Sequence, residues 1–225
     1  MKTAVLLGMG GLGCPAALAL SEERPALRLV LVDPDRVDRS NLPRQILFRD
    51  GDVGQLKAEV AASRLPNAVA RAVRFDAATA ASLLRDADVV LDGTDDPQTR
   101  FFANDECLRR GIPLVHGAAL GWTGQILTIL PSGPCLRCLF EGPPRDPDTC
   151  ARAGVLAPLC GVVGAEMAHA ALEVLDGRAQ PAILRRFDAR RGTVRPFRVP
   201  RDPDCPACIQ EPPTRTKETT PCPSP

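Results

Sequence analysis

Four glycines near the start of the chain have the spacing of a phosphate-binding turn. They form the run GMGGLG, residues 8–13, between a buried strand expected over 2–7 and an apolar helix expected over 11–21. Gly8 suits a tight turn, and Gly13 lets the helix pack closely on the strand. Gly10 and Gly11 let the backbone approach a phosphate. A second expected strand, 27–32, ends at Asp33, where a carboxylate can accept hydrogen bonds from ribose hydroxyls. The combination favours nucleotide binding over a plain strand-to-helix connection.

Charged residues beyond Asp33 indicate a triphosphate that is handled reactively. Arg44 offers a planar fork of donors for phosphate oxygens, and Lys57, which we expect at an exposed helix start, offers a compact point charge. Asp95 follows an expected strand, 88–92, at the carboxyl edge where open α/β sheets bind ligands. A carboxylate beside a polyphosphate is the usual way to hold Mg²⁺. Each residue alone fits a solvated loop charge equally well, but a hydride-transfer enzyme has little need for the set.

Two C-x-x-C pairs indicate a zinc site. They are Cys135 with Cys138 and Cys205 with Cys208, among nine cysteines in the chain. This spacing is typical of zinc hooks, and the long separation predicts a site that staples the C-terminal segment onto the main domain. Free buried thiols, a redox pair and two disulfides are the alternatives. A closed structural zinc would take no part in the reaction.

Cys150 is the one cysteine with a possible chemical role. It lies in a polar loop, ahead of a helix that we expect to start near residue 155, with Arg152 close by. A helix N-terminus and a cation lower a thiol's pKa and favour nucleophilic character, although a surface thiol without a task fits equally well. We expect Cys14, Cys107 and Cys160 to pack in the core, and the two histidines, His116 and His169, to be structural rather than catalytic.

Composition and element order predict one α/β domain. The 225 residues are 44% hydrophobic with a net charge of +1, which suits one sizeable core and disfavours a nucleic-acid-coating protein. We expect further strands at 69–75 and 113–118, and helices at 54–65, 77–85 and 97–110. This order gives a Rossmann-like, doubly wound, mostly parallel sheet. A strand at 124–130, a helix at 155–175 and a hairpin over 183–187 and 193–199 would extend it in antiparallel fashion.

Targeting signals and the tail complete the organisation of the chain. The sequence indicates no apolar run long enough to qualify as a membrane span, so we expect none, and the start of the chain does not resemble a signal peptide, so we expect a cytoplasmic protein. The domain is expected over 1–210. A Pro- and Thr-rich tail, 211–225, is expected to be disordered because it has too few apolar residues to bury.

Several long motifs resemble the ThiF/MoeB/HesA family, the bacterial relatives of ubiquitin-activating enzymes. They include GMGGLG, LVDPD, SNLPRQ, DVGQLK, LDGTDD and PLVHGAALGWTGQI, and the resemblance extends from Lys2 to about Cys208. It implies an adenylyltransferase that uses ATP and Mg²⁺ to activate the C-terminal glycine carboxylate of a small ubiquitin-like sulfur carrier, of the molybdopterin or thiamine type. It also implies a homodimer and paired zinc hooks. The residues it places against ATP or its metal, with the motif neighbours that we add, are Gly8, Gly10, Gly11, Gly13, Asp33, Ser40, Asn41, Arg44, Gln45, Lys57, Asp95 and Asp96.

The chain also departs from the family's pattern. Relatives usually carry an N-terminal helical segment whose arginine reaches a neighbouring subunit's ATP site, whereas here the first strand follows Met1 almost directly. Asp96 replaces a frequent asparagine and adds negative charge. No rhodanese-like domain follows, so sulfur would arrive from another protein. We therefore expect slow pyrophosphate exchange by the chain alone, with Arg145 or Arg152 filling the missing role.

Four interpretations follow from these residues. The first is the sulfur-carrier adenylyltransferase, and the second is a same-fold enzyme that activates another carboxylate or amide, of the peptide-modifying or tRNA-dehydratase type. The third is an NAD-dependent redox enzyme, which the charged set opposes. The fourth is an ATP-binding partner with weak or no turnover. Release of pyrophosphate separates the first two from the others.

Overall fold

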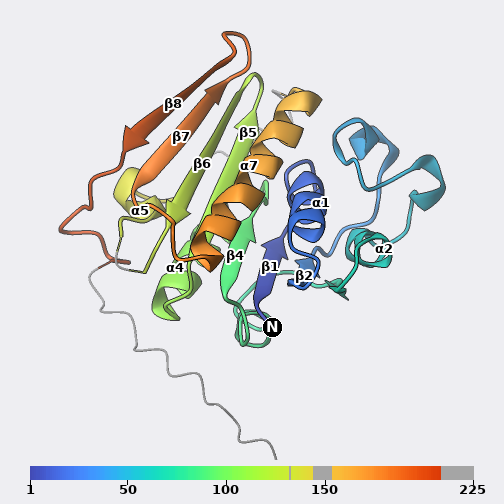
Figure 1. The fold of residues 1–225 in the computed structure, drawn as a ribbon, viewed down its shortest axis with the longest axis horizontal. Helices are drawn as coiled ribbons and strands as arrows, with labels where there is room; N and C mark the ends of the chain where they lie inside the picture. Colours follow the sequence, from blue (N-terminus) through green and yellow to red (C-terminus); the bar gives the residue numbers. More distant parts are fainter. Residues whose placement is uncertain (132, 144–153, 209–225) are drawn as a thin grey trace, which may run out of the picture.

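The protein is described here by a computed structural model over residues 1–131, 133–143 and 154–208, in which helices cover both faces of a single eight-stranded sheet (Figure 1). The strands are β1 (Thr3–Leu7), β2 (Arg28–Val32), β3 (Ala68–Arg71), β4 (Val89–Asp92), β5 (Leu114–Leu120), β6 (Thr123–Ile129), β7 (Ile183–Asp188) and β8 (Thr193–Arg198). The helices are α1 (Gly13–Glu23), α2 (Lys57–Arg64), α3 (Ala80–Leu83), α4 (Pro97–Arg109), α5 (Leu136–Leu139) and α7 (Ala157–Leu175), with 3₁₀ turns η1 (Arg39–Arg44) and η2 (Asp50–Asp52).

The sheet combines a parallel half and an antiparallel half. Its strand order is β3-β2-β1-β4-β5-β6-β7-β8, and the pairs from β3 to β5 are all parallel. From β5 onwards each pair is antiparallel. The chain moves outwards from β1 to β3 and then returns to the other side of β1 with β4, so the carboxyl ends of β1 and β4 form the switch point where such sheets bind ligands. The doubly wound sheet and its antiparallel extension are confirmed.

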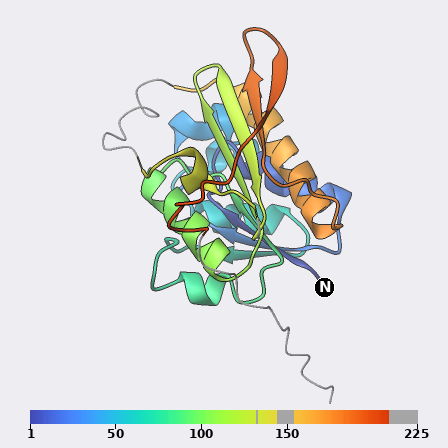
Figure 2. The same ribbon diagram turned by 90° about the vertical axis from the view of Figure 1, so that its left-hand side faces the viewer.

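Alternating apolar residues divide the core between the two faces. Ala4 and Leu6 of β1 belong to a cluster with α1, α2 and α7, whereas Val5 and Leu7 belong to a cluster with α3, α4 and α5. Figure 2 shows α4 and α7 on opposite sides of the sheet. This alternation is the period of two expected of a strand buried on both faces.

Helix α7 is the longest helix of the described residues, and it corrects one expectation. Ala157–Leu175 is long and apolar enough, by length and composition, to cross a membrane, so the expectation that no run would qualify was wrong. Half of this apolar stretch is buried inside the protein. A Cβ on Gly124 of β6 would lie 2.5 Å from a methyl of Val163, which shows how closely α7 packs on the sheet. These contacts are those of a core helix.

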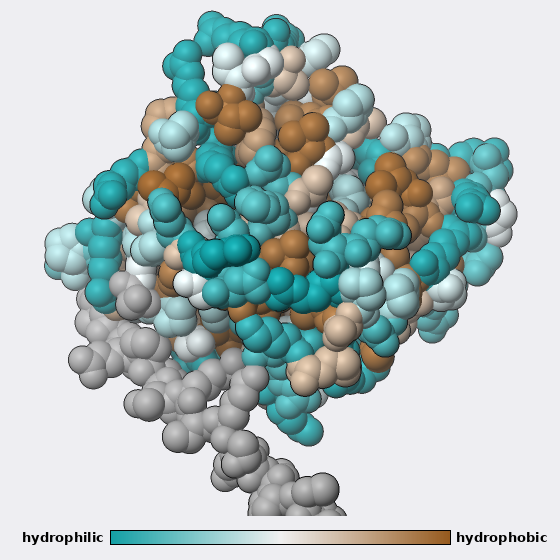
Figure 3. Space-filling view, in the orientation of Figure 1, coloured by the Kyte–Doolittle hydropathy of each residue, from teal (hydrophilic) through white to brown (hydrophobic). Residues whose placement is uncertain are grey.

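Helix bounds differ most from expectation where polar side chains interrupt them. Helix α3 covers Ala80–Leu83 instead of 77–85, because Asp76 Oδ1 accepts the amides of Ala78 and Thr79 (3.0 and 3.1 Å) and forms a turn. The 3₁₀ turns have no apolar periodicity and were not predicted. Hydrophilic residues gather over the tip of the β7–β8 hairpin, at the top of Figure 3. Cys150, Arg145, Arg152 and the tail lie outside the described residues.

Candidate active site

The glycine turn between β1 and α1 needs glycine at two positions. Gly8 has φ of +85°, a conformation that residues with a side chain rarely adopt. A Cβ on Gly13 would lie 1.9 Å from the carbonyl oxygen of Gly8, so only glycine lets α1 begin this close to β1. Gly10 and Gly11 line the cavity that opens in front of the turn. The N-terminus of α1 therefore faces open space at the switch point, where backbone amides suit an anion.

Asp33 has a structural task in addition to the one expected from sequence. Its side chain is 4% exposed, and its two oxygens accept the amides of Met9 (2.7 Å) and Asp35 (2.8 Å). The carboxylate therefore ties the end of β2 to the glycine turn. Burial raises the pKa of Asp33, and the nearby charge of Lys57 opposes that rise. Asp33 also lines the cavity, and each oxygen keeps a second lone pair for a ribose hydroxyl.

Lys57 lies deeper than expected. The sequence predicted an exposed helix start, but Lys57 is 6% exposed at the beginning of α2. Its ammonium contacts the carboxylate of Asp35 at 3.1 Å, and Asp35 itself is 67% exposed. A buried ammonium at the wall of a cavity is desolvated and fixed in place, which strengthens its interaction with an anion inside. The correction therefore supports the predicted phosphate contact.

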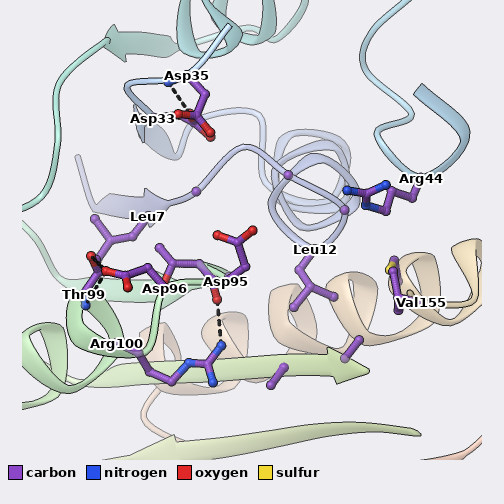
Figure 4. Close-up of a pocket in the computed structure, with 18 of the residues that line it drawn as sticks. Leu7, Leu12, Asp33, Asp35, Arg44, Asp95, Asp96, Thr99, Arg100 and Val155 are labelled. Carbon is purple, nitrogen blue, oxygen red and sulfur yellow. Dashed lines mark hydrogen bonds between the residues drawn. The ribbon is translucent and has the colours of Figure 1, made fainter. Parts of the chain in front are cut away.

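The η1 turn brings Arg44 to the same cavity. Its guanidinium donates to the Oδ1 atom of Asn41, and its side chain packs against Gly11. In Figure 4 Arg44 points towards the start of α1. Gln45 is 3% exposed, and its Oε1 has no hydrogen-bond partner within the described residues. Both residues line the cavity, so a cation and an unsatisfied buried amide face the same space.

Asp95 and Asp96 are adjacent in sequence but differ in what they contact. Asp95 is exposed and lines the cavity, and its side chain makes no hydrogen bond or ion pair with any described residue. Asp96 caps α4, since its Oδ2 accepts the amide (2.9 Å) and hydroxyl (2.6 Å) of Thr99. The free carboxylate of Asp95 therefore suits Mg²⁺, which prefers one or two carboxylates plus phosphate oxygens and water. Asp96 has a cap role that the sequence analysis missed.

A buried polar network lies directly behind these acids. Asp92 ends β4 and His116 is its neighbour on β5, with 2.8 Å between Asp92 Oδ2 and His116 Nδ1. The other oxygen of Asp92 accepts the amide and hydroxyl of Thr94 (3.0 and 2.6 Å). Arg100 donates to the carbonyl of Thr94 at 2.8 Å, shown dashed in Figure 4, and its Nε lies 3.9 Å from Asp92. The network fixes the backbone that carries Asp95, and His116 has the structural role expected of it.

The cavity at the switch point has a volume of about 700 Å³ and gathers most of the predicted residues. Those lining it are Gly8, Gly10, Gly11, Asp33, Asn41, Arg44, Gln45, Lys57, Asp95 and Asp96. Ser40 does not line it, and its amide and hydroxyl donate to Asp38, while Gly13 is buried behind the turn. Eight further polar residues line the cavity without having been predicted, and they are Asp35, Arg74, Thr94, Thr99, Arg100, Thr123, Gln125 and Arg186. Gln125 and Arg186 could have been found from the sequence, because the first lies in the motif PLVHGAALGWTGQI and the second lies on the strand expected over 183–187.

The four hook cysteines come together at one point, although the two C-x-x-C pairs are far apart in sequence. Their sulfur atoms all lie within 4.8 Å of one another, with 3.7 Å between Cys135 and Cys205 and 3.5 Å between Cys138 and Cys208. Disulfide sulfurs are about 2.05 Å apart, whereas thiolates on tetrahedral zinc, with bonds of about 2.3 Å, lie about 3.8 Å apart. Helix α5 starts directly after Cys135, a feature shared with redox pairs, but four converging sulfurs fit zinc.

The remaining described cysteines are buried, as expected. Burial raises the pKa of Cys14 to about 12, so this thiol stays neutral. Cys107 is buried in the α4 face of the core. Cys160 of α7 is also buried, but it lines the cavity beside Gly11, and burial raises its pKa despite the opposing charge of Arg44. Neither Cys14 nor Cys160 has the lowered pKa of a nucleophile.

A glycine turn at a switch point, a buried acid after β2 and cations around one cavity are typical of a nucleotide-binding α/β domain. The chain belongs to the ThiF family, which matches residues 2–207. It is 41% identical over 215 residues to the SAMP-activating enzyme E1 of Haloferax volcanii, covering 91% of this chain and 79% of that protein. It is 40% identical over 227 residues to the sulfur carrier protein adenylyltransferase of Thermus thermophilus, covering 94% and 83%.

The fold has a counterpart among solved structures. The crystal structure of Escherichia coli MccB with ATP superposes with a TM-score of 0.78 at 20% identity, over 92% of this chain and 66% of that one. At this identity the likeness establishes the fold alone.

Proposed function

We propose that the protein is an adenylyltransferase that activates the C-terminal carboxylate of a small ubiquitin-like sulfur-carrier protein. A carboxylate oxygen attacks the α-phosphorus of ATP, the bond from that phosphorus to the bridging oxygen of the β-phosphate breaks, and pyrophosphate leaves with the electron pair. The carrier becomes an acyl adenylate. The observation that carries the proposal is the convergence of Asp33, Arg44, Lys57 and Asp95 on one cavity.

Each of these side chains has a task that its surroundings support. Asp33 orients the ribose, while Arg44 and the buried Lys57 hold phosphate oxygens. Asp95 holds Mg²⁺, which neutralises charge on the phosphates when it is bound. No general base is needed, because the attacking carboxylate is already ionised. Catalysis then depends on positioning and on fixed positive charge, the two features this cavity provides.

The kind of acceptor rests on the relatives. Two proteins about 40% identical over nearly the whole chain are named for SAMP activation and for sulfur-carrier adenylylation. We assign the same class of acceptor here, and we keep Cys150 as a thiol that would act after adenylation.

The proposal predicts ATP–pyrophosphate exchange that requires a carrier ending in Gly-Gly. Lys57→Met should lower the exchange rate by on the order of a hundredfold, because it removes a preorganised cation while keeping a side chain of similar length. Lys2→Met is the matched control. Lys2 lies at the end of β1 away from the glycine turn, and its ammonium donates to the Leu175 carbonyl. Circular dichroism should show both variants folded.

Two results would contradict the proposal. One is calorimetry showing tight binding of NAD and no binding of ATP. The other is a Lys57→Met protein that is folded and exchanges pyrophosphate at the rate of the Lys2→Met control.

A further inference from the structure

Two arginines of the β7–β8 hairpin form a row that leads into the cavity. In the sheet register Gln125 of β6 pairs with Arg186 of β7, and Arg186 pairs with Arg195 of β8. Directly paired residues point to the same face of a sheet, so these three side chains stand side by side. Gln125 and Arg186 also line the cavity. The row therefore continues the cavity towards the edge of the sheet.

The face that carries this row is the one opposite α7. Phe187, the next residue along β7, is buried in the cluster that includes α7, and Arg185 pairs with Glu166 of α7 at 2.8 Å. Arg186 alternates with both and must point away from α7. On its own face, α4 and α5 pack beneath Leu184 and Val199. Figure 2 shows the hairpin rising beyond the end of α4.

Neither arginine of the row has a partner in the part of the chain that the structure describes. Arg186 and Arg195 are exposed, and no hydrogen bond or ion pair within residues 1–131, 133–143 and 154–208 involves their side chains. Six arginines and one aspartate give residues 183–198 a charge of +5, while the whole chain carries +1. The surplus of positive charge is thus concentrated on this hairpin, where the unpaired Arg186 lines the cavity and the unpaired Arg195 stands beside it.

The nucleotide alone does not account for this end of the cavity. The expected partners of ATP lie near β1, β2 and the carboxyl end of β4, whereas β7 is five strands from β2 in the sheet order. At about 4.8 Å per strand this is roughly 24 Å. The carboxylate that attacks the α-phosphorus must belong to a chain that approaches from somewhere, and the open end at β7 provides an entry lined by polar and cationic side chains.

We propose that the Arg186–Arg195 row binds acidic residues of the acceptor, in the segment immediately before its C-terminal carboxylate. This inference rests on the proposed function and adds the chemistry of the acceptor's tail. Charge complementarity at a rim mainly steers association and selects partners. Nucleic acid is disfavoured because the row is continuous with the cavity where a carboxylate must react, and because the net charge of the chain is close to zero.

The test uses fluorescent peptides that end in Gly-Gly, with glutamates upstream in one and lysines at the same positions in the other. Affinity for the full-length protein is measured by anisotropy with Mg²⁺ and a non-hydrolysable ATP analogue. The acidic peptide should bind more tightly than the lysine peptide. Its affinity should fall as the salt concentration rises from about 0.05 M to about 0.5 M. Arg186→Glu and Arg195→Glu should each weaken its binding roughly three- to tenfold.

The matched control is Arg198→Glu. Arg198 is exposed, is on the same strand as Arg195 and has no described partner, but its register with Ile183 places it on the α7 face. It should leave acidic-peptide binding unchanged, and all three variants should keep the affinity for the ATP analogue. Equal loss in the Arg195 and Arg198 variants, equal binding of the two peptides, or no binding of the acidic peptide would overturn the inference.

Two further outcomes separate this inference from the proposed function. Arg186-dependent binding of the acidic peptide without any pyrophosphate exchange would sink the function and leave the row intact. Pyrophosphate exchange with a Gly-Gly carrier at a rate that neither Arg186→Glu nor Arg195→Glu changes would support the proposed function and contradict the role of the row. A single-stranded oligonucleotide that binds with the same dependence on both arginines, and displaces the peptide, would assign the row to nucleic acid instead.

Discussion

At the residue scale, the site depends on buried charges whose protonation is set by their neighbours. Asp92 and His116 are both almost completely buried and share one hydrogen bond. Burial lowers the pKa of His116 and outweighs the opposite effect of Asp92. Burial also pushes the pKa of Asp92 upwards, but His116 and Arg100 together leave it lowered. His116 is therefore neutral and donates its Nδ1 proton to the ionised Asp92.

This pair predicts a loss of stability in mild acid. An unfolded histidine takes up a proton near pH 6.5, while the folded His116 resists it, so the free energy of unfolding should fall as pH drops below about 6.5. The slope from one such group is at most about 1.4 kcal/mol per pH unit. Urea unfolding between about pH 7 and pH 5.5 measures it. His116→Asn should flatten the slope, since asparagine can still donate to Asp92 without titrating.

His169 provides the control for that experiment. It is the only other histidine of the chain, and its side chain is 62% exposed on α7. His169→Asn should leave the pH dependence as in the wild type. A His116→Asn protein whose stability falls with acid as steeply as the wild type would show that this pair does not control it.

The residue scale also shows where sequence reasoning stops. Asp33, Arg44, Lys57 and Asp95 were predicted because each follows a strand or motif with a known orientation towards the switch point. The burial of Lys57 was not predictable, because it depends on how α2 packs beside β2. The Asp92–His116 hydrogen bond could have been predicted, since Asp92 ends β4 and His116 lies opposite it on the neighbouring parallel strand β5.

At the element scale, hydrophobic alternation specifies the strands and most helices, while polar contacts set their ends. The order and type of the strands and main helices follow from the sequence, including the antiparallel hairpin. The segment between β2 and α2 does not, because η1 and η2 are held by hydrogen bonds that the carboxylates of Asp38 and Asp52 accept from backbone amides rather than by apolar periodicity. That segment delivers Arg44 and Asn41, so part of the site rests on structure that no periodicity reveals.

The cap of α4 gives a prediction at this scale. Asp96→Ala should lower the free energy of unfolding by about 1 kcal/mol, because the amide of Thr99 loses its acceptor. Asp96→Asn should retain most of that stability, since asparagine is an equally good N-cap. The adjacent Asp95→Ala removes a side chain without a described partner, so its stability should change by less than about 0.5 kcal/mol.

Activity should separate the two aspartates in the opposite direction. Asp95→Ala should abolish Mg²⁺-dependent pyrophosphate exchange, whereas Asp96→Asn should keep it. Urea unfolding and exchange assays on the same preparations measure both effects. If Asp96→Ala were as stable as the wild type, the cap would have no energetic role. If Asp95→Ala were fully active, the metal would be held elsewhere.

At the scale of the whole molecule, the antiparallel half of the sheet needs an attachment that its own strands do not supply. β8 is an edge strand, and most of its side chains are exposed. Beyond it, Cys205 and Cys208 return to the α4 side, where α5 is anchored by the Leu136 amide on Asn104 (3.0 Å) and by Arg137 on Asp105 (2.7 Å). The sulfur cluster therefore joins the end of the hairpin to the parallel half.

Zinc at this cluster should hold the two halves together. Elemental analysis should find close to one zinc per chain, and Cys205→Ser should lose it, because three thiolates and a hydroxyl bind the metal far less well. Loss of a structural metal costs several kcal/mol, so the melting temperature should fall by on the order of 10 °C. Cys14 is a buried cysteine of α1, remote from the cluster, so the Cys14→Ala variant should keep its zinc. Zinc loss in both variants would point to general unfolding. A metal-free protein as stable as the zinc-bound form would show that the hairpin is held by packing alone.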